Sequence, residues 1–309
     1  MTSLAHWDEV ASESGEVGHL GGTWTDLGEA AGSVAVGLNR IQVPEGKWST
    51  PAHVELGEEE IFYVLAGSGV SLQGDEAYEV GAGDCLAHLI GATTHTLRAG
   101  AAGLDVLAFG MRTPPGGTYL PRAGVVRMDP GTAVARADKH AWELEAEAGE
   151  PEVPPPSERP GTIVAADEVP ADEFGAGGDV QSFCRDLGEA VGSVRTGLNL
   201  VSVPPGKLGA PPHCHSAEEE LFVVLEGDGT LLLGEDEHPV RAGHIVARPA
   251  GTGVAHALRA GHGGLTYLAY GTREPNDIAF YPRSGKVSFR GVRVIARLER
   301  LEYWDGETL

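Results

Sequence analysis

The sequence repeats itself once, at a displacement of 160 residues. The stretch DLGEAAGSVAVGLN begins at Asp26, and DLGEAVGSVRTGLN begins at Asp186. The same displacement relates His53 to His213, Glu60 to Glu220, Gly67 to Gly227 and Gly83 to Gly243. Beyond the next loop it becomes 161, relating His95 to His256. Because a fixed period identifies the structural unit before any strand or helix is assigned, we expect two copies of one domain.

Between the two copies lies a stretch rich in charge and proline, residues 143–160, which reads ELEAEAGEPEVPPPSERP. These residue types disfavour both a packed core and a regular helix. We therefore predict an N-terminal domain over residues 1–142, a linker over 143–160 and a C-terminal domain over 161–309.

Short β-rich runs recur in both copies, such as IFYVLAG at residues 61–67 and LFVVLEG at 221–227. Clusters of Gly, Pro, Asp and Glu separate these runs, and the chain holds 45 Gly and 20 Pro. This rhythm predicts an all-β fold, a barrel or a sandwich. One helical candidate, residues 294–303, fits strand spacing equally well, and the pattern decides neither way.

Acidic residues outnumber basic ones by 45 to 22, giving a net charge of -23. The surface should repel phosphate backbones and anionic lipids, so we expect neither nucleic-acid nor membrane partners. The first ten residues lack the basic end and apolar run of a secretion signal, which favours a cytoplasmic protein. Three scattered cysteines, Cys85, Cys184 and Cys214, suggest reduced thiols rather than disulfides or a thiolate zinc site.

The second copy contains a group of side chains that are typical metal ligands. His213 and His215 flank Cys214, and on a strand the two imidazoles point to one face while the thiol points to the other. Glu220 begins the next strand, and a hairpin connection can return its carboxylate beside them. His256 follows a Pro-Ala-Gly turn and can face the same cavity. Histidines that only fill a barrel interior are the alternative, but this combined pattern favours a metal site.

Two segments, GKLGAPPHCHSAEEELFVVLEG and GHIVARPAGTGVAH, resemble the two signature motifs of the cupin superfamily. The resemblance implies two tandem jelly-roll barrels with few short helices, a bicupin. It also implies that His213, His215, Glu220 and His256 are metal ligands. Three imidazoles and one carboxylate suit Mn, Fe, Ni, Co, Cu or Zn without choosing among them.

The first copy carries a different set at the matching positions: His53, Glu55, Glu60 and His95. Two imidazoles and two carboxylates still suit Mn, Fe or Zn. A domain that has lost its metal and is kept for packing explains the same residues. Both alternatives stay open, and the extra carboxylate would lower the Lewis acidity of an ion held there. If one of the two sites is catalytic, we therefore expect it to be the second.

Other residues near the second site are weaker candidates. Arg248 could anchor a substrate carboxylate, while Tyr267 and Tyr270 lie on a later strand. Cys214 is expected to be a buried apolar contact. Two matching Pro-Arg pairs are expected to belong to the scaffold: Pro121-Arg122 and Pro282-Arg283.

The function expected from these residues is that of a metal-dependent enzyme acting on a small organic acid or an enolizable molecule, with Glu220 and Arg248 as candidate catalytic residues. Bicupins of similar layout include dioxygenases, oxalate decarboxylases and aminohydrolases, and we favour an oxidoreductase of the dioxygenase type. A binding or storage protein without turnover is the main alternative. A sugar-phosphate isomerase ranks last, because the chain is so acidic. Association into homo-oligomers is also expected.

Overall fold

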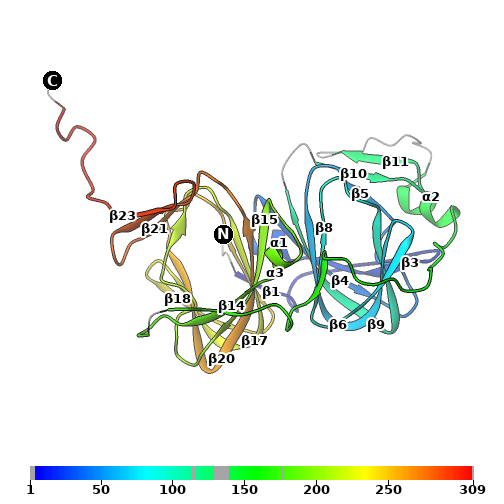
Figure 1. Ribbon diagram of the computed structural model, residues 1–309, viewed down its shortest axis with the longest axis horizontal. Helices are drawn as coiled ribbons and strands as arrows, with labels where there is room; N and C mark the ends of the chain where they lie inside the picture. Colours follow the sequence, from blue (N-terminus) through cyan, green and yellow to red (C-terminus); the bar gives the residue numbers. More distant parts are fainter. Residues whose placement is uncertain (1–3, 113–115, 129–138, 176, 308–309) are drawn as a thin grey trace.

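The computed structural model describes residues 4–112, 116–128, 139–175 and 177–307. It shows two β-barrels side by side, with short helices between them and at the outer edge of the first barrel (Figure 1). The predicted all-β, two-barrel architecture is confirmed. Among the described residues, no helix is long and apolar enough to cross a membrane.

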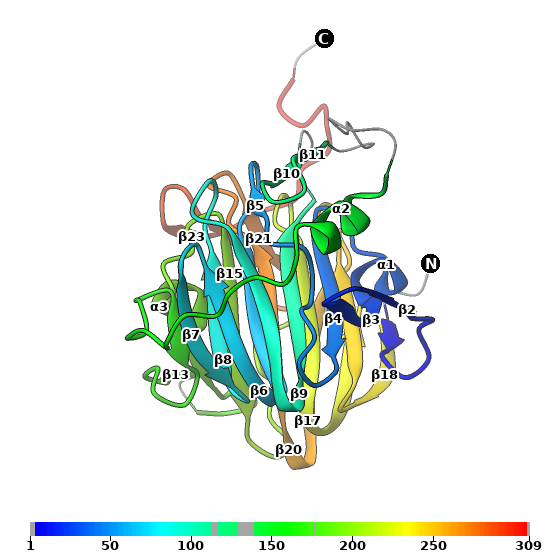
Figure 2. The ribbon, with the colours of Figure 1, turned by 90° about the vertical axis from the view of Figure 1, so that its right-hand side faces the viewer.

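The first barrel is an eight-stranded antiparallel sheet in the order β12-β8-β6-β9-β4-β3-β2, with β7 paired to β6. Looking onto this barrel, Figure 2 shows β7, β8, β6, β9, β4 and β3 in that order. A three-stranded sheet, β11-β10-β5, lies across one end. The strands are β2 (Glu13–Val17), β3 (Leu20–Asp26), β4 (Val36–Val43), β5 (Val54–Glu55), β6 (Glu60–Gln73), β7 (Glu76–Gly81), β8 (Asp84–His88), β9 (His95–Met111), β10 (Gly117–Leu120), β11 (Val125–Met128) and β12 (Ile163–Ala165).

The second barrel repeats this arrangement in the order β1-β19-β17-β20-β15-β14-β13, with β18 paired to β17. A four-stranded sheet, β16-β21-β22-β23, lies at its end. The strands are β1 (Leu4–His6), β13 (Asp172–Phe174), β14 (Ser182–Asp186), β15 (Thr196–Val203), β16 (Cys214–His215), β17 (Glu220–Leu233), β18 (Asp236–Arg241), β19 (His244–Arg248), β20 (His256–Thr272), β21 (Ile278–Tyr281), β22 (Lys286–Phe289) and β23 (Val294–Arg297).

Two long strands, β17 and β20, run the whole length of the second barrel and bend midway. The bend coincides with register shifts between Val224 and Glu226 and between Gly227 and Gly229. Gly227 has a φ of 80°, and a Cβ there would lie 2.2 Å from the carbonyl oxygen of Gly264. Only glycine fits, which explains why both copies of the motif carry it at this position.

Each barrel is completed by a short edge strand that comes, in the sequence, just before the other barrel. Leu4 pairs with Val246 at the β19 edge, so the N-terminal strand β1 completes the second barrel. Ile163 pairs with Leu86 at the β8 edge, so β12 completes the first. The predicted domain boundaries at residues 142 and 161 remain a prediction, and the two barrels exchange their edge strands.

A single apolar cluster lies between the barrels and draws on both of them. On β6, Ile61 and Tyr63 face this cluster, whereas Phe62 and Val64 face the interior of the first barrel. Phe109 and Tyr270, one from each barrel, meet with ring centroids 5.0 Å apart. Two short helices, α1 (Leu27–Ala31) and α3 (Leu187–Ala190), bury their leucines there. The barrels therefore pack through their outer sheet faces.

The predicted linker is partly helical, which corrects the expectation from its composition. Helix α2 (Ala141–Glu147) covers its first residues, because good helix formers precede Pro151 and a capping box between His140 and Glu143 starts the helix. Glu145 is fully buried and lies 2.6 Å from the guanidinium of Arg122. The stretch is thus fixed to the first barrel. At the other end of the chain, the ambiguous segment 294–303 begins as strand β23.

Candidate metal centre

Three separate strands bring the predicted ligands of the second barrel to one place. His213 and His256 face each other across an antiparallel bridge, with the amide of His256 donating to the carbonyl of His213 at 2.8 Å. His215 ends β16, and Glu220 begins β17. This convergence depends on pairing between segments about 40 residues apart in the sequence, and it brings the four predicted residues close together.

One carboxylate oxygen of Glu220, Oε2, lies at the centre of the group. The Nε2 atoms of the histidines lie 2.8 Å (His256), 3.4 Å (His215) and 3.9 Å (His213) from it. All four side chains are largely buried, and three of them, His213, Glu220 and His256, line one cavity. Ligand atoms of His213, Glu220 and His256 lie within 4.8 Å of one another, and Nε2 of His215 is close to the same carboxylate oxygen. These are donor atoms of the type that first-row transition metals prefer.

The outward nitrogens of two of these rings are tied to acceptors. His213 donates from Nδ1 to the carbonyl oxygen of Pro211 at 2.8 Å. His215 donates from Nδ1 to the carboxylate of Asp277 at 2.6 Å. Because these partners can only accept, both rings carry their proton on Nδ1 and present an Nε2 lone pair to the centre.

The carboxylate of Glu220 and the neighbouring histidines shift one another's pKa values. Burial opposes ionisation of Glu220, but the neighbouring histidines, His256 foremost, hold its pKa well below the usual value. Burial lowers the pKa of His213 and so favours its neutral form. Burial also opposes protonation of His215, but Glu220 and Asp277 outweigh it and raise the pKa of this ring. The group thus holds an ionised carboxylate among imidazoles that its negative charge attracts.

Buried polar atoms of this group show whether the residues suit a metal ion. Apart from their contact with each other, Oε2 of Glu220 and Nε2 of His256 have no hydrogen-bond partner among the described residues, and Nε2 of His215 has none either. Buried polar atoms without partners are uncommon in proteins. A divalent cation coordinated by these atoms would satisfy all three, so the residues fit such an ion.

A largely apolar cavity of about 500 Å³ opens onto His213, Glu220 and His256. Its walls include Phe222, Tyr267 and Leu258. A bound molecule in this cavity would lie against the ligand group on one side and apolar side chains on the other. Such a combination is typical of small-molecule sites in proteins.

The first barrel gathers a similar but not identical group. His95 Nε2 lies 2.9 Å from Oε2 of Glu60, and His53 Nε2 lies 3.6 Å from it. Glu55 lies 3.6 Å from His53 but also accepts from the hydroxyl of Thr118 at 3.0 Å. Its counterpart in the second barrel, His215, is held instead by the carboxylate of Asp277. Burial opposes ionisation of Glu60, yet its histidine neighbours lower its pKa strongly.

A further histidine, His88, belongs to the surroundings of this first group. Its ring stacks on His95 with centroids 3.7 Å apart, and its Nε2 is buried without a hydrogen-bond partner. Burial, then repulsion from His95, lowers the pKa of His88 well below the usual value. Arg248 stands at the matching place in the second copy, opposite Glu220 as His88 is opposite Glu60.

The weaker candidates lie in different places. Arg248 is buried and donates to the hydroxyl of Thr252 and the carbonyl of Val254 in the next loop. Tyr267 lines the cavity, whereas Tyr270 faces the cluster between the barrels. Cys214 is buried and is not among the described residues that line this cavity. Like Cys85 and Cys184, it is a free thiol, as predicted.

Sequence reasoning did not find Asp277 and Tyr281. Besides holding His215, Asp277 accepts from the backbone amide of Ala217 at 2.9 Å, and Tyr281 stacks on His213 with centroids 5.5 Å apart. Displaced by 161 residues, the counterpart of Asp277 is Gly116, so the repeat gave no signal for it.

Comparison with known proteins completes the description of the site. The Cupin domain family model matches residues 39–101 and 199–267, one match in each copy. A manganese-containing oxalate decarboxylase from Bacillus subtilis is 15% identical, with a TM-score of 0.58, over 86% of this chain and 76% of its own. An oxalate decarboxylase from Lactobacillus farciminis, solved with formate, is 14% identical, with a TM-score of 0.59, over 87% and 86%. No curated protein matches the sequence. At these identities the structural likeness concerns the fold alone.

Proposed function

The chain belongs to the cupin superfamily with two cupin domains in tandem, and we propose that its second barrel is the active site of a metal-dependent enzyme. The proposed ligands are His213, His215, Glu220 and His256. The proposed reaction is the oxidative cleavage of an enolizable molecule by O2, as in dioxygenases. The first barrel's group, His53, Glu55, Glu60 and His95, is proposed as a secondary metal site.

The observation that carries the proposal is the set of buried donor atoms around Oε2 of Glu220. Two rings are locked in the tautomer that offers Nε2 inward, by Pro211 and Asp277. Fixing the tautomer through the outward nitrogen is how proteins orient histidine ligands. A buried carboxylate with no other partner for its inner oxygen supplies the negative charge that a divalent cation needs.

A bound divalent ion would supply Lewis acidity and a coordination position for a substrate oxygen or O2 beside the cavity. The chain's own residues bind and orient: the three imidazoles leave the carboxylate of Glu220 as the only negative ligand. Apolar walls such as Phe222 and Leu258 exclude water from that side. A dioxygenase places both atoms of O2 in its products, so no separate reductant is required.

The second barrel is preferred over the first because its ligands include one carboxylate instead of two. Glu55 would bring the first group to neutrality with a divalent ion and weaken the ion's pull on a substrate oxygen. Its hydrogen bonds to Thr118 also hold it away from a purely coordinating role.

Metal analysis of purified variants tests the ligand assignment. We expect His213→Ala and His256→Ala each to remove one transition-metal equivalent per chain, measured by elemental analysis. His262→Ala is the matched control, since this histidine lies exposed on the same strand β20. Unchanged metal content in both ligand variants would refute the assignment, and parallel His53→Ala and His95→Ala variants count any ion in the first barrel.

The reaction type is tested by gas exchange with a panel of enolizable compounds and small carboxylic acids. Consumption of one O2 per substrate by the metal-loaded protein supports oxidative cleavage. Release of CO2 without O2 uptake would replace it with decarboxylation. Thermal stabilisation by a compound without any product would point to a binding protein instead.

A further inference from the structure

The cavity beside the second ligand group has walls that are mainly apolar. It measures about 500 Å³, a size that holds a molecule of one or two rings. Apart from the ligand residues, its larger lining side chains are Phe174, Val201, Pro211, Phe222, Leu258 and Tyr267. Phe174 is 55% exposed, so an aromatic ring stands at the entrance while others line the interior.

The internal repeat shows which substitutions make this space. Cys184, a lining residue, stands where the first copy has Trp24, which packs against the first barrel's interior cluster. Tyr267 stands where the first copy has Val106, which belongs to that cluster. The second copy has therefore replaced an indole by a small thiol on one wall and gained a phenol on another.

The hydroxyl of Tyr267 lies beside another residue of the cavity wall. It lies over Gly209, another lining residue, where an added Cβ would come within 2.4 Å of it. Its ring is held edge-on against Phe222, with centroids 5.8 Å apart. Burial raises the pKa of Tyr267, so its hydroxyl stays protonated and can donate a hydrogen bond.

The walls of the cavity favour an apolar molecule. None of the described residues that line the cavity is Arg or Lys. The guanidinium of Arg248, which is opposite Glu220, is buried and donates to the hydroxyl of Thr252 and the carbonyl of Val254 in the next loop. A small dianion bound at the ligand group would leave the apolar walls without a contact, whereas a ring compound would cover them.

Building on the proposed function, we propose that the second barrel selects a flat, mainly apolar molecule of one or two rings that bears a phenolic or enolic hydroxyl beside a second oxygen. The rings lie among Phe222, Leu258 and Tyr267, and the two oxygens face the ligand group. The Tyr267 hydroxyl donates to the oxygen substituents. Small dicarboxylates such as oxalate are disfavoured, because they would leave the apolar walls of the cavity uncovered.

Calorimetric titration of the manganese-loaded full-length protein tests this selectivity. The probes are 2,3-dihydroxynaphthalene for the proposed class and oxalate for small dianions. We expect the ring compound to bind at least tenfold more tightly, with the metal content unchanged after titration. Equal or tighter binding of oxalate to fully loaded protein would overturn the inference.

Binding experiments on protein without metal distinguish a failure of this inference from a failure of the proposed function. The cavity walls exist without the ion, so 2-naphthol should bind the metal-free protein and slow alkylation of Cys184 but not of Cys214. If the protein takes up no metal yet binds 2-naphthol in this way, the proposed function fails and the apolar selectivity stands. If the protein holds metal but neither ring compound binds or protects Cys184, the selectivity fails alone.

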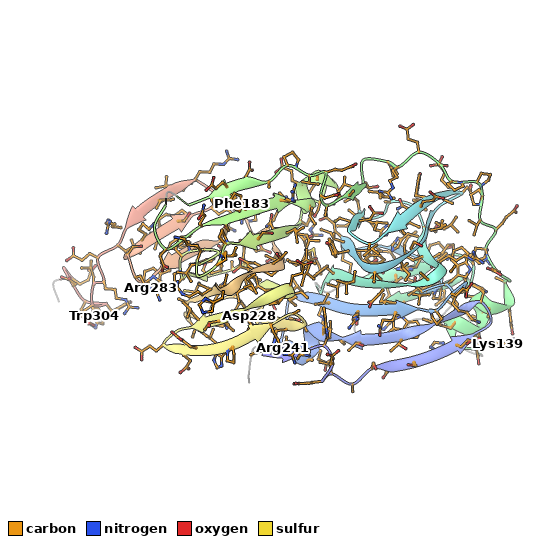
Figure 3. All side chains as sticks on the ribbon, turned by 90° about the horizontal axis from the view of Figure 1, so that it is seen from below. Lys139, Phe183, Asp228, Arg241, Arg283 and Trp304 are labelled. Atoms are coloured by element: carbon orange, nitrogen blue, oxygen red, sulfur yellow. The ribbon has the colours of Figure 1, made fainter. Side chains whose placement is uncertain are left out.

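Two variants locate the binding within the cavity. Cys184→Trp restores the bulk found in the first copy and should weaken binding of 2,3-dihydroxynaphthalene at least tenfold without loss of metal. Phe183→Trp is the control, because Phe183, labelled in Figure 3, is the adjacent residue of β14. It is 38% exposed and is not among the described residues that line the cavity. Tyr267→Phe should weaken binding about 2- to 12-fold, as expected for one lost hydrogen bond. Full affinity in Cys184→Trp would contradict the assigned cavity.

Discussion

Asp277 determines which nitrogen of His215 faces the proposed metal centre. One oxygen, Oδ2, accepts from Nδ1 of His215, and the other, Oδ1, accepts from the backbone amides of Ala217 and Glu218. The same carboxylate therefore fixes both the tautomer of one ligand and the turn that leads to the strand of Glu220.

Replacing Asp277 by Asn should weaken metal binding while preserving the turn. The amide oxygen can still accept from the backbone, but the amide nitrogen cannot accept the proton of His215. We expect the metal affinity of the second barrel to fall about 10- to 100-fold, as for other outer partners of histidine ligands. Competition with a chromogenic chelator measures this affinity. The corresponding variant in the first barrel is Thr118→Val, which removes a side-chain hydrogen-bond donor to Glu55. An unchanged affinity in Asp277→Asn would show that His215 is not a ligand through Nε2.

Cys184 provides a pH-dependent readout of the cavity wall. Burial, then the carboxylates of Asp186 and Asp172, raise the pKa of this thiol to about 11. A raised pKa keeps the thiol protonated at neutral pH, and only the thiolate is nucleophilic. We expect alkylation by iodoacetamide at pH 8 to be roughly a hundredfold slower than for a free cysteine, and to rise about tenfold per pH unit up to about pH 10. Mass spectrometry follows the modified peptide, and fast labelling at pH 7 would contradict a buried wall position.

At the scale of elements, the exchange of edge strands joins the two barrels. Strand β1 covers the free edge of β19 through Leu4, Ala5 and His6. Directly after it, Trp7 packs into the cluster between the barrels and lies under the guanidinium of Arg40, 4.6 Å from the ring centroid. The segment thus contributes both sheet pairing and apolar contact.

Removing residues 1–7 should destabilise the second barrel and the contact between the barrels. Each buried apolar side chain that is lost costs ~1.5–3 kcal/mol, so we expect the thermal midpoint to fall by about 5 °C or more. Removing residues 301–309 is the control of similar length, because the described part of that segment is exposed, as Figure 3 shows for Trp304. If both truncations lower the thermal midpoint equally, β1 has no specific role in stabilising the second barrel.

The sequence predicted the barrel but not this exchange, for a physical reason. The repeat and the β-rich runs identify each barrel and the ligands that its long strands carry. A three-residue edge strand has too little pattern to choose between two equivalent edges, and Leu86 and Val246 are matching positions of the two copies. Asp277 was missed for a similar reason, since a single side chain in a turn acquires its role only when the sheet closes.

At the scale of the whole molecule, two buried glutamates connect the barrels reciprocally. Glu219 of the second barrel accepts from the backbone amides of Val34 and Ala35, at 2.7 and 2.5 Å. These amides follow helix α1 of the first barrel. Glu219 thus has a structural role at the contact between the barrels, whereas the next residue, Glu220, is a proposed metal ligand.

The matching residue of the first barrel, Glu59, makes the same connection in the opposite direction. It accepts from the hydroxyl of Ser193 at 2.7 Å and from the amide of Arg195 at 3.0 Å, just after helix α3. Helices α1 and α3 lie between the barrels in Figure 1, so the two contacts flank the shared apolar cluster. Duplication has thus produced an approximate two-fold arrangement in which each copy supplies a carboxylate to the other.

Glu59→Gln and Glu219→Gln should each reduce the free energy of unfolding by about 1–3 kcal/mol, because an amide nitrogen would then face buried donors that the carboxylate satisfied. Chemical denaturation followed by fluorescence measures the change, with the exposed Glu79→Gln as control. Because the two contacts use different partners, their effects should add in the double variant within about 0.5 kcal/mol. A double variant no less stable than either single one would mean that losing one contact already separates the barrels. Stability unaffected by any of these changes would mean that the apolar cluster alone holds the barrels together.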